Sequence, residues 1–211
     1  MHALKTSNIF FSLISITKEQ FYQIFLRVSS SFQGVPWSPT VHLGLFVHRV
    51  KGIPSGLYML IREKNMLEVF KACMHQDFEW KKPAGCPESL MLYCLKEGDY
   101  IDVSKGVSCT QNIAGDGVFS LGMIAQFDDS LNKNGAWFYK RLFWETGMIG
   151  QLLYLEAEAV GISSTGIGCF FDDPVHDIFG FRDTKFQSLY HFTIGGAVID
   201  KRLTTLPAHE H

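Results

Sequence analysis

The spacing of hydrophobic positions predicts several amphipathic helices. In residues 17–29 apolar side chains recur every three or four positions, which is the spacing of one helix face: Phe21, Ile24, Phe25 and Val28. Thr17 and Gln20 stand three residues apart at its start, the pattern of a capping box. Residues 65–75, 136–160 and 172–181 are also predicted to be helical. The third of these four helices is expected to be interrupted near Gly147 and Gly150.

A second pattern, of alternating or continuous apolar residues, predicts strands. Residues 41–50 and 57–62 flank the turn Ile53-Pro54-Ser55-Gly56, which indicates an antiparallel hairpin. Continuous apolar character predicts a buried strand at 117–127, and alternation predicts a strand at 188–195. The interleaved elements without a strict βαβ repeat indicate an α+β class with a mixed sheet. No linker or repeat divides residues 1–211, so we expect a single domain, with a weakly defined segment 1–16 and an irregular tail 197–211.

Composition narrows the function classes. Hydrophobic residues make up 46% of the chain and the net charge is −2, which excludes global disorder. Without a basic excess, no nucleic-acid partner is expected. No apolar stretch reaches the length of a membrane span, so no membrane partner is expected either. Five cysteines without a C-x-x-C pair favour a reducing, cytoplasmic location over a disulfide framework or a zinc ribbon.

Few patterns carry chemistry by themselves. The nucleophile elbow, the P-loop and a true G-x-G-x-x-G are absent from the sequence. Cys109 is interpreted as a structural cysteine rather than as a nucleophile. The acidic cluster around Asp173 and His176 fits a helix start better than a metal site. Gly166-Ile167-Gly168 can bring backbone N–H groups close to a flat or anionic ligand, and Lys201 with Arg202 can hold a phosphate.

The order of five sequence blocks resembles the flavin-dependent nitroreductase family, and most closely its SagB/ThcOx-type branch of thiazoline and oxazoline dehydrogenases. The blocks are Pro54-Ser55-Gly56-Leu57-Tyr58, Gln111 with the strand 117–127, the segment 144–161 that begins Trp144-Glu145-Thr146-Gly147, Gly166 to Asp173, and Leu189 to Gly196. The most specific part is 144–173, where a helix is followed directly by the glycine segment.

The resemblance implies a three-layer α+β sandwich with a mixed, mainly antiparallel sheet and a central apolar helix, 148–159, at a homodimer interface. It implies an FMN-dependent oxidoreductase that transfers hydride between flavin and a small-molecule or peptide-heterocycle substrate. It also implies cofactor contacts from Ser7, Gln111, Gly166, Ile167, Gly168, Lys201 and Arg202, with no metal. Catalytic acid and base residues, and the choice of NADH, NADPH or neither as electron donor, remain unassigned.

The sequence departs from the family pattern at several positions. The opening arginine motif is replaced by Lys5-Thr6-Ser7, the usual histidine of the central helix is Met148, and the usual asparagine is Leu152. These departures leave open a flavin-free binding or scaffold subunit of the same fold. A lobe of a larger assembly is a third interpretation.

Overall fold

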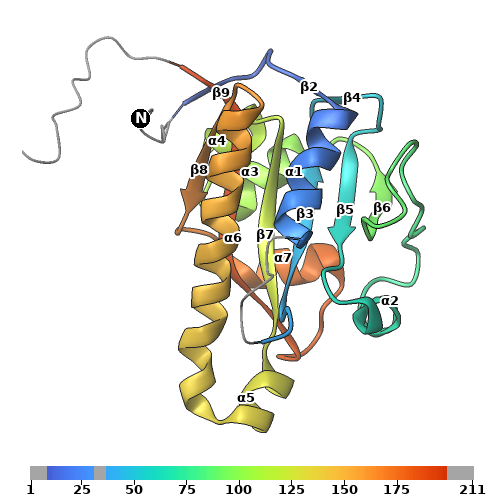
Figure 1. Ribbon diagram of the computed structural model, residues 1–211, viewed down its shortest axis with the longest axis vertical. Coiled ribbons are helices and arrows are strands. Elements are labelled where there is room, and N and C mark those ends of the chain that lie inside the picture. Colours follow the sequence, from blue (N-terminus) through green and yellow to red (C-terminus); the bar gives the residue numbers. More distant parts are fainter. Residues whose placement is uncertain (1–8, 31–36, 199–211) are drawn as a thin grey trace, which may run out of the picture.

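The computed structural model describes residues 9–30 and 37–198. Within them, one antiparallel seven-stranded sheet forms the middle of the molecule (Figure 1). Its main path runs β1 (Phe10–Phe11), β9 (Phe186–Ala197), β7 (Phe119–Gln126), β3 (Val41–Val47), β5 (Gly56–Leu60) and β6 (Leu92–Glu97). The seventh strand, β8 (Ser163–Ile167), pairs with β9 alone, beside β1. A short parallel pair joins β2 (Ile16–Thr17) to β4 (Val50–Lys51).

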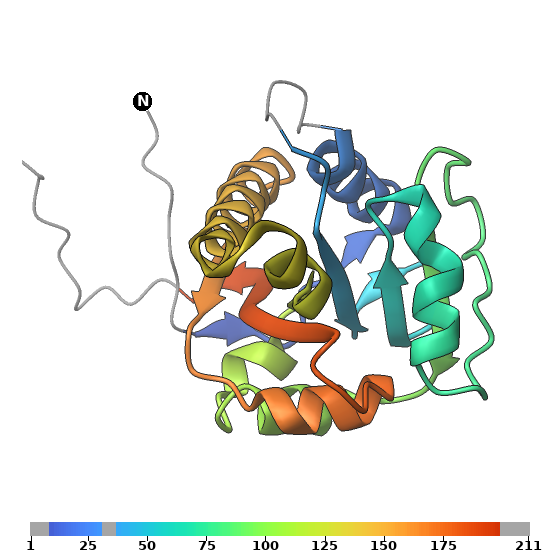
Figure 2. The same cartoon turned by 90° about the horizontal axis from the view of Figure 1, so that it is seen from below.

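Helices cover both faces of the sheet, which gives three layers. Figures 1 and 2 show α1 (Lys18–Ser30) and α6 (Tyr139–Ala159) side by side on one face. The opposite face carries α3 (Ile101–Val107), α4 (Asn112–Asp116) and α7 (Asp172–Phe179). The smaller elements are α2 (Leu67–Cys73), α5 (Asp128–Asn134) and the 3-10 turns Lys64–Met66 and Ala136–Phe138. The predicted three-layer α+β sandwich is therefore confirmed, with the seven-stranded sheet antiparallel throughout.

Strand alternation divides the apolar side chains into two cores. In β3, Leu43 and Leu45 face α1 and α6, whereas Phe46 faces the layer with α2 and α7. Every residue of β3 is buried, so both faces of this central strand are covered, and His42 is its one polar side chain. The predicted hairpin is also confirmed, since β3 pairs with β5 in antiparallel register from Leu43–Leu60 to Val47–Gly56.

Of two local predictions for the helices, the capping box of α1 is confirmed and the interruption of α6 is not. The Thr17 Oγ1 accepts a hydrogen bond from the Gln20 N–H at 3.3 Å, and the Gln20 side chain accepts one from the Thr17 N–H at 2.9 Å, as the capping box predicts. The predicted interruption near Gly147 and Gly150 is wrong: α6 runs unbroken over both glycines. A glycine costs helix stability only about 1 kcal/mol, which packing of the buried face on the sheet overcomes.

A buried ion pair fastens α6 to the sheet. The Arg62 guanidinium, just beyond β5, contacts the Glu145 carboxylate, and both side chains have zero exposure. The same carboxylate accepts hydrogen bonds from the Thr40 N–H at 3.0 Å, the Thr40 hydroxyl at 2.7 Å and the Val41 N–H at 3.2 Å. One carboxylate therefore joins the helix to the start of β3 and the end of β5.

None of the helices in residues 9–30 and 37–198 combines the length and the apolar character that a membrane span requires.

Candidate functional site

The predicted glycine segment lies at the end of an edge strand. Gly166 and Ile167 close β8, opposite Phe192 and His191 of β9. No other described strand pairs with the outer side of β8. An edge strand presents backbone N–H and C=O groups to whatever lies beside it. The segment is thus placed to offer backbone hydrogen bonds to a ligand.

A groove borders this edge strand on the α6 side. It has a volume of about 320 Å³ and is lined by α6 and β9, with aromatic walls and small residues on the helix: Phe143, Thr146, Gly147, Gly150, Gln151, Tyr154, Tyr190 and Phe192. At Gly147 an added Cβ would meet no atom within 4 Å, so the groove is open there. Flat apolar walls of this kind suit a planar aromatic ligand.

Two tyrosines join the groove to the glycine segment. The Gly166 N–H donates to the Tyr154 hydroxyl at 3.0 Å. A Cβ on Gly166 would lie 2.5 Å from the Tyr190 hydroxyl oxygen, so this position must be glycine while Tyr190 stays in place. Burial, helped by the nearby Tyr154, raises the pKa of Tyr190, which therefore keeps its proton at neutral pH. Both hydroxyls are therefore hydrogen-bonding groups beside Gly166.

The other predicted residues of this segment have different roles. The Ile167 side chain is 2% exposed and packs with Phe10, Ile113 and Ala114, so only its backbone can reach a ligand. Gly168 is exposed, and a Cβ there would make ordinary contact with the Tyr190 ring at 3.8 Å. Gly168, unlike Gly166, can therefore be substituted without a clash in this fold.

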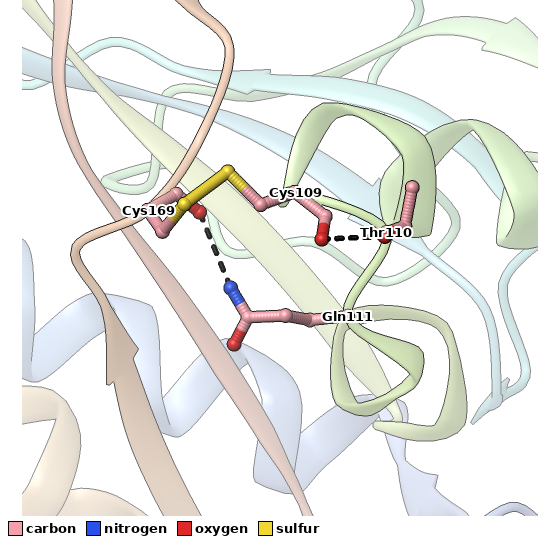
Figure 3. Close-up of a disulfide and its surroundings, with 4 residues drawn as sticks. All are labelled: Cys109, Thr110, Gln111 and Cys169. Atoms are coloured by element: carbon pink, nitrogen blue, oxygen red, sulfur yellow. Dashed lines mark hydrogen bonds between the residues drawn. A yellow bond between two sulfur atoms is a disulfide. The ribbon is translucent and has the colours of Figure 1, made fainter.

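Gln111 lies close to the same segment, on the other side of the strand. It precedes α4, and its side-chain amide donates to the Cys169 carbonyl oxygen at 3.3 Å (Figure 3). The fold therefore gathers four predicted site residues: Gln111, Gly166, Ile167 and Gly168. The other three, Ser7, Lys201 and Arg202, lie outside the described residues.

A disulfide joins Cys109 to Cys169 beside Gln111 (Figure 3). The cysteine spacing argued against disulfides, and this bond corrects that expectation. Sixty residues separate the two cysteines, and only the packing of the α3–α4 turn against the end of β8 brings their Cα atoms to 5.8 Å. The remaining cysteines, Cys73, Cys86 and Cys94, are free thiols.

Sequence reasoning missed Tyr154 and Tyr190 as well as the disulfide. Tyr190 and Phe192 alternate on one face of β9, and that alternation was visible in the sequence. Nothing local distinguished Tyr154 from the other apolar positions of α6. Within the described residues, no group of three or more His, Cys, Asp and Glu side chains could hold a metal ion. His176 of the acidic cluster turns inward, where its Nε2 accepts the Ser188 N–H at 3.2 Å.

A larger cavity of about 660 Å³ lies near the start of α6. Its lining is mostly polar and includes Ser38, Gln126, Lys133 and Arg141. The Arg141 guanidinium lies 4.2 Å from the Trp37 ring, a cation–π contact. None of the residues that line this cavity contacts the glycine segment, whereas Tyr154 and Tyr190 of the aromatic groove both do, so the groove is the better candidate site.

Comparison with known proteins finds a matching family model. The model of the Nitroreductase family matches residues 59–196, which is more than half of the chain. Comparison with curated proteins finds no match.

Several solved structures share the fold at low sequence identity. A nitroreductase described as putative, from Anabaena variabilis, superposes with a TM-score of 0.67 at 16% identity, covering 92% of this chain and 36% of its own. The chain thus spans little more than a third of that protein. A chain of the E. coli microcin synthetase McbBCD complex with truncated pro-MccB17 bound superposes with a TM-score of 0.66 at 16% identity. The match covers 95% of this chain and 71% of that chain. An Exiguobacterium sibiricum protein, also described as a putative nitroreductase and in complex with FMN, superposes with a TM-score of 0.51 at 12% identity. The match covers 96% of this chain and 89% of that protein.

Proposed function

The chain belongs to the nitroreductase family, and we propose that it is an FMN-dependent oxidoreductase whose flavin lies in the groove between α6 and the β8–β9 edge. The observation that carries the proposal is the edge strand ending in Gly166-Ile167-Gly168 beside an aromatic groove. The solved structure with bound FMN supports the choice of cofactor. When bound, FMN would supply the hydride chemistry.

The shape of the groove suits a flavin ring, and the Gly166 edge beside it carries a backbone donor that Tyr154 occupies. Its aromatic walls suit the flat ring system, and Gly147 leaves room above the helix. The Tyr154 hydroxyl accepts the Gly166 N–H at the place where a flavin nitrogen or oxygen would accept it. A flavin that takes the Gly166 N–H must therefore displace this hydroxyl, whereas the backbone at Gly168 is exposed.

The remaining predicted contacts complete the proposed cofactor site. Gln111 reaches the same end of β8 and holds the Cys169 carbonyl, so it positions the chain immediately after Gly168. Ser7, Lys201 and Arg202 are proposed to contact the flavin phosphate, because a phosphate favours hydroxyl and cationic donors. They lie outside the described residues, so this assignment rests on the sequence resemblance.

A homodimer is part of the proposal. α6 leaves several large apolar side chains exposed: Tyr139 at 48%, Phe143 at 38%, Trp144 at 50% and Leu155 at 48%. Trp144 and Leu155 are eleven residues apart and so share the face turned away from the sheet, whereas Phe143 lies on the groove side. Large exposed apolar side chains on one helix favour association. A second copy that packs on α6 and reaches Phe143 would cover the flavin site.

The substrate class is proposed to be a small molecule or a peptide heterocycle, in a SagB-type reaction. The similarity to the McbBCD complex, which was solved with truncated pro-MccB17, supports a peptide. NADH and NADPH are the electron donors to test first, because one neighbour is a Vibrio harveyi NADPH:FMN oxidoreductase in complex with NAD⁺, with a TM-score of 0.53 at 12% identity. We assign no catalytic acid or base.

The test is FMN titration of the purified protein, followed by flavin fluorescence. Tyr154→Phe removes the hydroxyl that competes for the Gly166 N–H. A neutral hydrogen bond contributes about 0.5–1.5 kcal/mol, so FMN should bind about 2- to 13-fold more tightly to this variant. Tyr22→Phe is the matched control, because it removes a tyrosine hydrogen bond of 3.1 Å, to the Ala84 carbonyl, away from the groove.

Two outcomes would contradict the proposal. Failure of the parent protein to bind FMN at all would favour the flavin-free scaffold subunit. Equal changes of FMN affinity in Tyr154→Phe and Tyr22→Phe would mean that the flavin does not bind at the Gly166 edge.

A further inference from the structure

The disulfide occupies a particular position relative to the groove. Cys169 directly follows Gly168, and Cys109 lies two residues before Gln111. The bond therefore links the end of the glycine segment to the turn between α3 and α4, and Figure 3 shows the Gln111 side chain reaching back toward the same cysteine. Reduction or formation of this bond therefore takes place next to the proposed cofactor contact.

The turn that holds Cys109 is strained. Cys109 has φ +54° and Thr110 has φ +57°, and neither residue is glycine. The left-handed region is unfavourable for residues with a Cβ, and most unfavourable for a β-branched one such as threonine. The Thr110 hydroxyl donates to the Cys109 carbonyl at 2.7 Å, which helps hold the turn (Figure 3). The surrounding contacts, the disulfide included, must maintain this conformation.

The bond is also accessible. Cys169 is exposed and Cys109 is half-buried, whereas the free Cys94 is buried. Exposed or strained disulfides are the ones that exchange with thiols, while buried ones resist reduction. Cys169 is the more exposed residue of the pair, so we take its sulfur as the one that an incoming thiolate attacks.

We propose that Cys109–Cys169 is a reversible thiol–disulfide exchange site whose oxidised form clamps the Gly168 end of the cofactor segment against the α3–α4 turn. Its substrate class is a small dithiol or a protein dithiol in the reducing direction, and a disulfide such as oxidised glutathione in the other. The effect on flavin rests on the proposed function, whereas the exchange itself does not.

The reduction proceeds in two displacements. A thiolate of the dithiol attacks the Cys169 Sγ, a mixed disulfide forms, and the Cys109–Cys169 bond breaks with its electron pair leaving on the Cys109 Sγ, which takes up a proton. The second thiol of the reductant then displaces the Cys169 Sγ, which is protonated in turn. The dithiol ends as a disulfide, and the two cysteines gain two electrons and two protons.

Two hydrogen bonds remain after reduction and limit how far the segment can move. Gln111 still holds the Cys169 carbonyl, and the Phe171 N–H still donates to the Val107 carbonyl at 2.8 Å. The expected change is therefore local loosening of residues 168–171 and of the turn at 108–110, with the sheet unaffected.

The first measurement counts thiols in the full chain. Alkylation of the unreduced, denatured protein followed by mass spectrometry should add three labels, at Cys73, Cys86 and Cys94, and reduction should raise this to five. Oxidised glutathione should restore three. Five labels without reductant would overturn the proposal, and so would a bond that native protein keeps in the presence of excess dithiol.

The second measurement is amide hydrogen exchange over residues 162–175 in the oxidised and reduced protein. Exchange at 168–171 should be about tenfold faster after reduction, and Cys109→Ser/Cys169→Ser should match the reduced form under both conditions. Cys73→Ser, which removes a free thiol on α2, is the matched control and should keep the oxidised–reduced difference. Equal exchange in both forms of the parent would show a passive crosslink and would overturn the clamp.

FMN affinity provides the third measurement and separates the two proposals. The reduced protein and the double serine variant should bind FMN about tenfold more weakly than the oxidised protein, because a loosened contact must be ordered on binding. If neither form binds FMN, the proposed function fails while the thiol count and exchange still test the clamp. Equal FMN affinity in both forms would overturn the link between the clamp and the cofactor.

Discussion

Substitution of Glu145 by glutamine is expected to destabilise the protein strongly. Its carboxylate is fully buried against the Arg62 guanidinium, which is also fully buried. Burial lowers the pKa of Arg62, an effect that Glu145 opposes. Glutamine keeps an oxygen for the Thr40 N–H but removes the negative charge that faces the arginine. Breaking a buried pair in this way costs about 3–5 kcal/mol.

The expected loss is large relative to the total stability of a domain, which is about 5–15 kcal/mol. For a chain of this size it corresponds to a fall in Tm of roughly 6–20 °C. Urea unfolding followed by circular dichroism measures the free energy, and calorimetry measures Tm. Glu68→Gln is the matched control: Glu68 pairs with Lys71 at 2.8 Å but is 78% exposed, so its loss should cost below about 0.5 kcal/mol.

A second variant separates charge from shape. Arg62→Met/Glu145→Gln removes both charges and should be more stable than Glu145→Gln alone, because no buried charge has lost its counter-ion. A loss below about 1 kcal/mol in Glu145→Gln, or no recovery in the double variant, would refute the electrostatic reasoning.

Three further predictions follow from the site and the core. Leu155→Glu should convert a dimeric parent to a monomer in light scattering, since a charge beside Trp144 on the exposed face of α6 opposes association; a monomeric parent would contradict the interface. Gly168→Val should fold with the Tm of the parent but lose FMN, and retention of FMN would place the ring elsewhere. Burial lowers the pKa of His42 and of His191 to about 3, and Arg62 adds to the effect at His42. Unfolded histidine titrates near pH 6.5, so stability should be full above that pH and fall towards pH 3 by about 1.4 kcal/mol per unit per histidine. Urea unfolding at pH 5 and pH 7 measures this slope, and equal stabilities would contradict it.

The sequence predicted those elements whose signals are local. The capping residues of α1 and the apolar alternation of β3 are properties of a few adjacent residues, and both predictions held. The segment 76–106 carries prolines and glycines with little periodicity, so β6 and α3 were not predicted there. The two glycines of α6 did not interrupt the helix as predicted, because the helix stability that they cost is smaller than the stabilisation from packing the helix on the sheet.

The candidate site was predictable only in part, for the same reason. The glycine segment has a recognisable composition and lies shortly after a predicted helix, so it could be found from the sequence. The Tyr154 contact to Gly166 and the bond between Cys109 and Cys169 depend on how distant elements pack. Long-range partners of this kind have no local signature.

The position of β9 has a consequence for the order in which the sheet can assemble. β9 lies between β7 on one side and β8 and β1 on the other. An emerging polypeptide that has reached residue 185 therefore contains β7 with one edge unpaired and β8 without a neighbouring strand. Unpaired strand edges recruit other chains, and nascent proteins are most exposed to aggregation while such edges persist. The synthesis of β9 thus shortens the vulnerable period, because one strand pairs with β7 and with β8 at the same time.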